Sequence, residues 1–245
     1  MLLGKGLGKA VFSLVALIAA GQASAFVLGP TTPGKWGSAT MGTGATVTYS
    51  YMADGVGCAE EFAGCTISAI DSFMGAGATA AIDAAFDAWS AVADITFINV
   101  ADQGEDFNAV SQLSGDIRLG GHLFDGAGGT LAHGFFPPAN GSSAAGDIHF
   151  DIAELWKTGL GGAGFNIFQV AAHEIGHAIG LGHSNVANSL MGAFYTEAFS
   201  GLQQDDIEGA QFIYGAPNSV PEPLTGALML VGLAMVGVRG RRSIV

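Results

Sequence analysis

The hydrophobic and polar positions of this chain follow two different periods, which predicts a fold built from both strands and helices. From Val47 to Met52 the sequence alternates threonine, tyrosine and apolar residues, a pattern typical of a strand. Residues 76–93 instead place Ile82, Phe86 and Trp89 at helical spacing in an alanine-rich segment. That spacing predicts an amphipathic helix with Trp89 in the core.

Two more strands and two more helices are expected on the same grounds. Asp94–Val100 and Gly115–Leu119 predict strands, and the second should lie in the middle of the sheet. Asn166–Ile179 predicts a helix that starts at Asn166, and Leu202–Gly215 predicts a closing helix with acidic residues in its first turn. A helix between strands favours βαβ packing with some parallel pairing, so we expect an α/β (α+β) fold with a mixed sheet.

The two ends of the chain differ from its middle. Residues 1–25 place lysines, an apolar run and Ala-Ser-Ala in the order of a secretory signal peptide, so the mature chain should begin at Phe26. Residues 26–216 suit one domain. Near the other end, the apolar run Leu224–Val238 precedes an arginine cluster at 239–242. This run is short for an independent transmembrane helix but adequate when the flanking arginines snorkel.

The charge of the chain narrows its partners. Its 245 residues carry a formal net charge of −13, and only 12% of them are charged. Such an acidic protein repels nucleic acid and anionic lipid surfaces, so no nucleic acid is expected as a partner. Secretion fits this composition, and clustered carboxylates can bind calcium.

Two cysteines, Cys58 and Cys65, lie seven residues apart in a glycine-rich segment. In an oxidising compartment they are expected to close a small loop as a disulfide. The alternative is a pair of free thiols. No cysteine or histidine follows them closely, so they do not resemble zinc ligands.

The stretch His173–Ser184 contains three of the six histidines of the chain. On a helix, His173 and His177 project from the same face and can reach one ion. Gly180 can end the helix and reverse the chain, which returns His183 as a third ligand. Three histidines with an open fourth position are typical of a catalytic zinc (Zn²⁺) site. The alternative is a polar helix face with incidental histidines.

Glu174 sits next to the first of these histidines but cannot serve as a fourth ligand on that face. It can instead accept a proton from a zinc-activated water, the role of a general base.

A long loop upstream, residues 120–146, combines glycines, carboxylates and two histidines, His122 and His133. His149 follows on a predicted strand, where it alternates with apolar neighbours. A structureless loop of this length is uncommon, and bound ions can hold one in shape. The alternative is a solvated polar loop.

Several motifs together resemble the matrixin branch of the metzincins, peptidase family M10, which includes the matrix metalloproteinases. The resemblance covers residues 76–215. Its motifs are H-E-x-x-H-x-x-G-x-x-H followed by Ser184, the Ser189-Leu190-Met191 segment, and the closing helix at 202–215. It implies a zincin-like catalytic domain with a twisted mixed sheet, a long active-site helix and a C-terminal helix. It also implies that Met191 forms a Met-turn beneath the zinc.

By position, the resemblance also implies further metal sites in the long loop. A calcium (Ca²⁺) site would be formed by Asp125, Gly126, Gly128, Thr130, Asp151 and Glu154. A second calcium site would use Asp116 and Asp147. A structural zinc would be held by His133 and His149. The His-x-Asp pair of the family has no counterpart upstream in this chain, so either His122 is the third ligand or the structural zinc is absent.

The segment 219–245 resembles a PEP-CTERM sorting signal, with Val220-Pro221-Glu222-Pro223 before the apolar run and the arginines. This resemblance implies a Gram-negative host and an exosortase-type processing enzyme as partner. It further implies a transient membrane anchor and a final location in the cell envelope or outside the cell.

Taken together, the sequence predicts an exported zinc metalloendopeptidase that hydrolyses protein or peptide substrates, with Glu174 as general base. Residues Phe194–Phe199 should line the pocket beside the zinc. The alternative is an exported extracellular matrix or surface protein whose metal sites are structural or adhesive. A base beside an open metal position has no use in such a protein. A third hypothesis, a zinc hydrolase acting on something other than peptides, is weaker because the resemblance extends well beyond the metal ligands.

Overall fold

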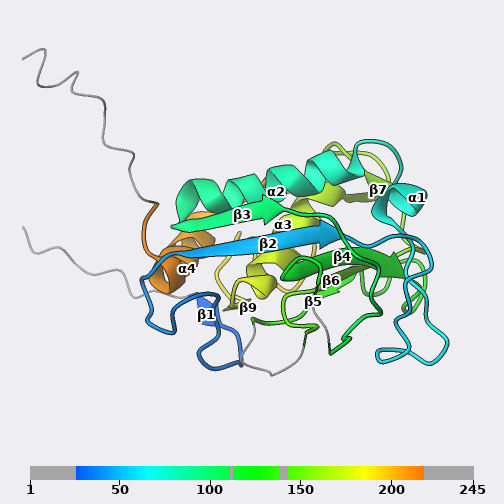
Figure 1. The fold of residues 1–245 in the computed structure, drawn as a ribbon. Coiled ribbons are helices and arrows are strands. Elements are labelled where there is room, and N and C mark those ends of the chain that lie inside the picture. The colour runs from blue at the N-terminus through cyan, green and yellow to red at the C-terminus, as the bar shows by residue number, and fades with distance from the viewer. Residues whose placement is uncertain (1–25, 111–112, 138–142, 218–245) are drawn as a thin grey trace, which may run out of the picture.

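A five-stranded mixed sheet forms the centre of the molecule. The computed structural model describes residues 26–110, 113–137 and 143–217. The expected signal peptide, residues 1–25, and the segment 219–245 lie outside the described residues. The strand order is β3-β2-β4-β6-β5, parallel except for β5, which runs antiparallel to β6 at one edge (Figure 1). The strands are β2 (Ala45–Tyr51), β3 (Ile95–Asn99), β4 (Ile117–His122), β5 (Ala132–Gly134) and β6 (Ile148–Asp151).

The sheet confirms the expected α/β class and the parallel βαβ unit, since β2 and β3 are parallel neighbours and a helix connects them. The middle strand is β4, as predicted, but it continues past Leu119 to His122. Gly120 and Gly121 hide this extension from the sequence pattern. A Cβ at Gly120 would overlap the side chain of Ile67, so the missing side chain allows close packing there.

Two long helices pack against one another beside the sheet (Figure 1). They are α2 (Ala78–Val92) and α3 (Ile167–Ala178), close to the predicted ranges. Trp89 of α2 is fully buried, and its Nε1 donates to the Ala172 carbonyl at 2.9 Å. The closing helix is α4 (Gln204–Tyr214). Its first turn contains Asp205 and Asp206, and Gly215 is its C-cap. A short helix, α1 (Ile70–Met74), was not predicted because five residues carry too little periodicity.

Two pairs of very short strands fix the segments around α3. The first pair joins β1 (Val27–Leu28) to β9 (Leu181–Gly182), and the second joins β7 (Trp156–Lys157) to β8 (Phe165–Asn166). The N-terminal segment, which has no periodic pattern, is therefore held by strand pairing against the residues that follow α3. The Gly29 N–H reinforces this contact by donating to the Gly180 carbonyl at 2.8 Å.

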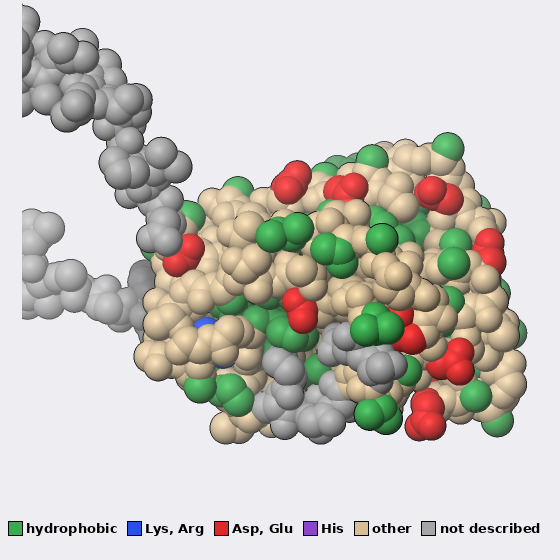
Figure 2. All heavy atoms as spheres, viewed as in Figure 1, with side chains coloured by type: hydrophobic (Ala, Val, Ile, Leu, Met, Phe, Trp, Pro, Cys, Tyr) green, Lys and Arg blue, Asp and Glu red, His purple; other side chains and the backbone are tan. Residues whose placement is uncertain are grey.

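The surface is acidic. Figure 2 shows carboxylates spread over the visible face, with almost no basic side chain among them. Among the described residues, Lys35 and Arg118 are buried, at 2% and 3% exposure, which leaves Lys157 as the cation nearest the surface. Within the same ranges, no helix is both long and apolar enough to cross a membrane.

The core beneath α2 gives a direct test of the fold. Ile82 is completely buried, so Ile82→Ala should lower the free energy of unfolding by about 2–5 kcal/mol through the lost burial and the cavity. Asp87→Ala, on the exposed face of the same helix, should change it by no more than about 0.5 kcal/mol. Urea unfolding at saturating zinc measures both. Equal effects of the two substitutions would contradict the packing described here.

Candidate metal centre and cleft

Helix α3 places the first two histidines of the centre. Asn166 caps the helix, with its Oδ1 accepting from the Gln169 N–H at 2.9 Å, so the helix starts where the sequence predicted. Gly180 ends it with φ of +111°, and a Cβ there would overlap the Gly34 carbonyl. The chain then reverses into β9 and presents His183. Only glycine combines this backbone conformation with so close a neighbour.

The three histidines converge on one point. His183 Nε2 lies 3.3 Å from His173 Nε2 and 3.2 Å from His177 Nε2. Zinc–nitrogen bonds of about 2.0–2.1 Å in a tetrahedral arrangement place ligand nitrogens about 3.3 Å apart. The spacing of these atoms therefore matches a tetrahedral zinc site with one corner open.

The protonation of the rings agrees with that geometry. His173 Nδ1 lies 2.7 Å from the Leu190 carbonyl, and His177 Nδ1 lies 2.7 Å from the Leu181 carbonyl. A carbonyl only accepts, so each Nδ1 carries the proton and each Nε2 has a free lone pair. Burial lowers the pKa of both rings, that of His177 to about 3. Neutral rings with lone pairs turned toward each other form a donor set that fits a cation.

Glu174 lies in the same buried region, at 6% exposure. The Gly134 N–H donates to its carboxylate, while Oε2 has no hydrogen-bond partner among the described residues. Burial raises the pKa of Glu174 to about 8. A cation held nearby would favour the charged form of this carboxylate. An unpaired buried oxygen beside the metal centre is therefore available to accept a proton.

Met191 packs against α3 at Gly176, between the first two histidines, and its segment Ser189–Met191 is called the floor below. It is 2% exposed, and a Cβ on Gly176 would overlap its sulfur, so the glycine lets the methionine approach the helix closely. The Ser184 N–H donates to the Met191 carbonyl at 2.8 Å, which ties the floor to the segment of His183.

The closing helix holds this floor in place through one carboxylate. Asp206 accepts from Ser189 Oγ at 2.6 Å, from the Leu190 N–H at 2.8 Å and from the Met191 N–H at 3.0 Å. It also accepts from the Gln203 N–H at 2.7 Å, as part of a capping box. Leu190 in turn accepts from His173, so a continuous hydrogen-bonded path joins α4 to a metal ligand.

A cleft of about 770 Å³ opens in front of the histidines. Strand β5 and helix α3 form parts of its wall, and four members of the predicted 194–199 segment line it: Phe194, Tyr195, Thr196 and Phe199. Gln169 also lines the cleft, and its Oε1 accepts from the Gly201 N–H at 2.9 Å. This polar residue was missed because its position in the cleft depends on the loop that folds back from residue 192 onward.

The residues expected to bind the first calcium make contacts along one loop. Asp125 accepts from the Thr130 N–H at 3.0 Å and from its hydroxyl at 3.0 Å. Glu154 accepts from the Gly128 N–H at 2.6 Å and so joins the loop to the segment after β6. Asp151 is buried, and its Oδ2 is unpartnered within the described ranges. Gly126 and Gly128 have φ of +89° and +85°, conformations that suit a tight loop around an ion.

The two residues expected to bind a second calcium make separate contacts. Asp116 accepts from the Thr48 N–H and hydroxyl at 2.8 and 2.7 Å. Asp147 is fully buried and accepts from the Arg118 N–H at 2.8 Å, while its Oδ2 has no partner in the described part of the chain. Burial raises the pKa of Asp147 well above its usual range.

The remaining three histidines, His122, His133 and His149, also meet, and Glu61 joins them. Glu61 was missed by sequence reasoning because it lies 61 residues before His122, in the Cys58–Cys65 loop. The disulfide that closes this loop is present. An acidic residue inside a disulfide loop does not by itself predict a metal ligand.

Comparison with known proteins decides the family. The family profile of the matrixins, peptidase family M10, matches residues 66–215. The chain belongs to the matrixin family. It is 43% identical over 147 residues to an interstitial collagenase of Bos taurus and 39% identical over 143 residues to karilysin of Tannerella forsythia. It is 42% identical over 143 residues to stromelysin-3 of Xenopus laevis.

These matches cover 57–59% of this matrixin chain but only 28–30% of the three relatives. The chain therefore spans less than a third of the length of the relatives it matches. The range that the family profile matches, 66–215, includes the three histidines, the Ser189–Met191 segment and α4.

The path from α4 to the metal centre gives a test. Asp206→Ala should leave three buried donors of the Met-turn without an acceptor and cost at least about 2 kcal/mol of unfolding free energy. It should also weaken zinc binding about tenfold, because His173 loses its support. Gln204→Ala, exposed in the same helical turn, is the control. Zinc competition titration and urea unfolding measure both effects; unchanged zinc affinity would contradict the proposed path.

Proposed function

We propose that this matrixin is a zinc-dependent metalloendopeptidase that cleaves internal peptide bonds of protein substrates. The observation that carries the proposal is the pairing of two features in one cleft. His183 Nε2 lies within 3.3 Å of the Nε2 atoms of His173 and His177, and the buried Glu174, whose Oε2 has no partner among the described residues, lines the same cleft. This is the arrangement that hydrolysis by an activated water requires.

The chain and its metal divide the work. The three histidines would hold a zinc ion, which would supply a Lewis acid for the scissile carbonyl and for the attacking water. Glu174 accepts the proton of the attacking water and later delivers it to the leaving amine. The Gly134 N–H holds one carboxylate oxygen of Glu174, so the free oxygen keeps a fixed direction.

The cleft also suits an extended substrate. Strand β5 is the edge strand of the sheet, paired with β6 on one side only, and its three residues line the cleft. A peptide that adds to this edge would gain backbone hydrogen bonds whatever its sequence. Its side chains would then reach the partly apolar wall formed by Leu190, Tyr195 and Phe199.

The competing hypothesis of a structural or adhesive metal protein accounts less well for Glu174. Burying a carboxylate oxygen without a partner costs free energy, and a purely structural site gains nothing in return. A hydrolase that acts on something other than peptides is also less well supported, because the edge strand in the cleft favours a peptide substrate.

We also propose that the matrixin binds structural ions. Three histidines, His122, His133 and His149, support a second zinc. The Asp125–Thr130 loop, together with Asp151 and Glu154, supports a calcium, since the buried carboxylates of Asp151 and Glu154 need a cation and Asp151 Oδ2 has no partner among the described residues. A second calcium would be bound by Asp116 and Asp147, the latter with an Oδ2 that lacks a partner within the described ranges.

We further propose that the protein is exported and sorted at its C-terminus. The support comes from the sequence: the signal-peptide pattern of residues 1–25, the Val220–Pro223 motif and the arginine cluster at 239–242. In this proposal, the apolar run 224–238 anchors the protein transiently in the membrane until an exosortase-type enzyme processes it. The acidic surface and the disulfide fit a location in the cell envelope or outside the cell.

The role of Glu174 is directly testable. Glu174→Ala should keep zinc at the three histidines but lower casein hydrolysis by about 10²–10⁴-fold, because the proton acceptor is lost. Elemental analysis reports the zinc, and release of labelled casein fragments reports the activity. Hydrolysis close to that of the unaltered protein, with zinc in place, would refute this role.

The requirement for metal is tested separately. A strong chelator should abolish casein hydrolysis by the unaltered protein, and stoichiometric zinc in calcium-containing buffer should restore it. Restoration by calcium alone would show that the activity depends on the loop ion and not on the three-histidine centre.

A further inference from the structure

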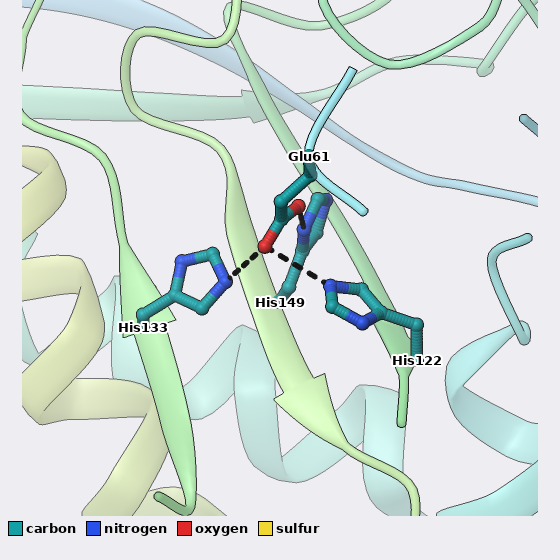
Figure 3. A group of neighbouring side chains, drawn as sticks. All are labelled: Glu61, His122, His133 and His149. Atoms are coloured by element: carbon teal, nitrogen blue, oxygen red, sulfur yellow. Dashed lines mark hydrogen bonds and ion pairs between the residues drawn. The ribbon is translucent and has the colours of Figure 1, made fainter. Parts of the chain in front are cut away.

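The second histidine cluster contains a ligand that neither the sequence nor the family comparison identifies. His133 of β5 and His149 of β6 are directly paired across the sheet, and His122 is the last residue of β4. Glu61 reaches them from the Cys58–Cys65 loop, and Figure 3 shows its carboxylate between the three rings. One ligand atom from each of the four residues lies within 4.8 Å of the others.

The carboxylate makes close contact with all three rings. Glu61 Oε1 lies 2.6 Å from His133 Nε2 and 3.1 Å from His122 Nε2, and Oε2 lies 2.6 Å from His149 Nδ1 (Figure 3). Three nitrogens and two oxygens thus share one small volume, as the ligand atoms of a metal site do.

The contacts of the two His122 ring nitrogens favour a bound cation. His122 Nδ1 lies 3.1 Å from the Leu123 carbonyl, so Nε2 is the nitrogen that faces the carboxylate of Glu61. An imidazole nitrogen whose other nitrogen contacts a backbone carbonyl has the arrangement of a metal-ligating histidine. A cation bound by Nε2 and the carboxylate would satisfy both groups.

His149 leads to the same conclusion from a different atom. It is 0% exposed, and its Nε2 has no hydrogen-bond partner in the described part of the chain. A proton on Nδ1 leaves the Nε2 lone pair buried and unpaired; a proton on Nε2 turns the Nδ1 lone pair toward Glu61. A cation on Nδ1 resolves the second case. The Phe107 ring packs edge-on against the His149 ring, with 4.9 Å between the ring centroids.

The cluster is closed, unlike the centre in the cleft. Glu61 is 10% exposed and His122 3%, and only His133 reaches 32%. Phe62 and Phe124 flank the His122 ring at 5.3 and 4.4 Å between ring centroids. Three histidines and one carboxylate in an apolar shell, with all four positions filled by protein, describe a structural zinc site.

The disulfide loop is what brings Glu61 to this place. The Cys58 carbonyl accepts from the Glu61 N–H at 3.0 Å and from the Phe62 N–H at 3.2 Å. The Cys58 N–H donates to the Cys65 carbonyl at 3.1 Å, alongside the disulfide. Glu61 therefore sits on a tight turn whose two ends are covalently joined.

We propose that Glu61 is the fourth ligand of the second zinc site, and that the bound metal locks the Cys58–Cys65 loop onto the sheet. This inference rests on the proposed second zinc and adds to it both a ligand and a coupling. Because the disulfide positions one ligand, disulfide and metal stabilise each other, and by linkage each must respond to loss of the other.

The neighbouring glutamate provides a matched control. Glu60 is exposed and lies next to Glu61 in the same loop, so Glu60→Gln changes the charge equally without touching the cluster. The full chain, Glu60→Gln and Glu61→Gln are each equilibrated in a series of zinc buffers, and zinc per chain is counted by elemental analysis. The full chain and Glu60→Gln should bind two zinc ions. Glu61→Gln should retain one and bind the other at least about tenfold more weakly.

The outcomes test the fourth ligand, the second zinc site and the proposed peptidase centre separately. Equal affinity for the second zinc in Glu61→Gln and Glu60→Gln would overturn the assignment of Glu61. A single zinc in the full chain, lost on His183→Ala, would overturn the second site while leaving the proposed peptidase centre intact. A single zinc that survives His183→Ala but is lost in Glu61→Gln would support this site and count against the centre in the cleft.

The coupling is tested by reduction of the disulfide with a phosphine reductant. Removing zinc with a chelator should speed reduction several-fold in the full chain and in Glu60→Gln. Glu61→Gln should be reduced at the faster rate from the start and respond little to chelator. Identical reduction rates with and without zinc in the full chain would overturn the proposed lock. This measurement remains informative even if Glu61→Gln is less stable, because the full chain alone decides it.

Discussion

The structure depends on holding three imidazole lone pairs against one another. His183 Nε2 lies 3.2–3.3 Å from the Nε2 atoms of His173 and His177, an arrangement that is repulsive without a cation between them. Residues that are not themselves ligands hold the three histidines in this arrangement. Carbonyls fix two of the rings, β1 pairs with the strand that precedes His183, and Asp206 holds the turn beneath them. Much of the domain serves to keep three nitrogens in place.

How far the sequence predicts the molecule depends on how local each feature is. Helix α3, its cap at Asn166 and the return at Gly180 are encoded within a short stretch, so spacing alone predicts them. The middle strand β4 was predicted too short, because its glycines pack closely and carry no hydrophobic signal. Glu61 and Gln169 were missed because their roles depend on segments that meet only after folding. No periodicity in the sequence links Glu61 to His122.

The two histidine clusters use similar ligands for opposite purposes. The cluster of the cleft has three histidines and an open side, and the Glu174 carboxylate nearby keeps one oxygen without a partner among the described residues. The cluster with Glu61 encloses its carboxylate among three rings and apolar side chains. The difference lies in the position of one glutamate: Glu174 is joined to a backbone N–H, whereas Glu61 contacts the histidines themselves.

The support that α4 gives to the Met-turn has a consequence for the order in which the protein matures. Chains are synthesised from the N-terminus and fold in domain units. Every histidine of the centre precedes Gln204–Tyr214, yet the floor of the centre is completed only when Asp206 docks on Ser189, Leu190 and Met191. A nascent chain that already exposes all three ligands therefore still lacks a finished site. Completion of the floor therefore waits for α4, the last helix in the described part of the chain.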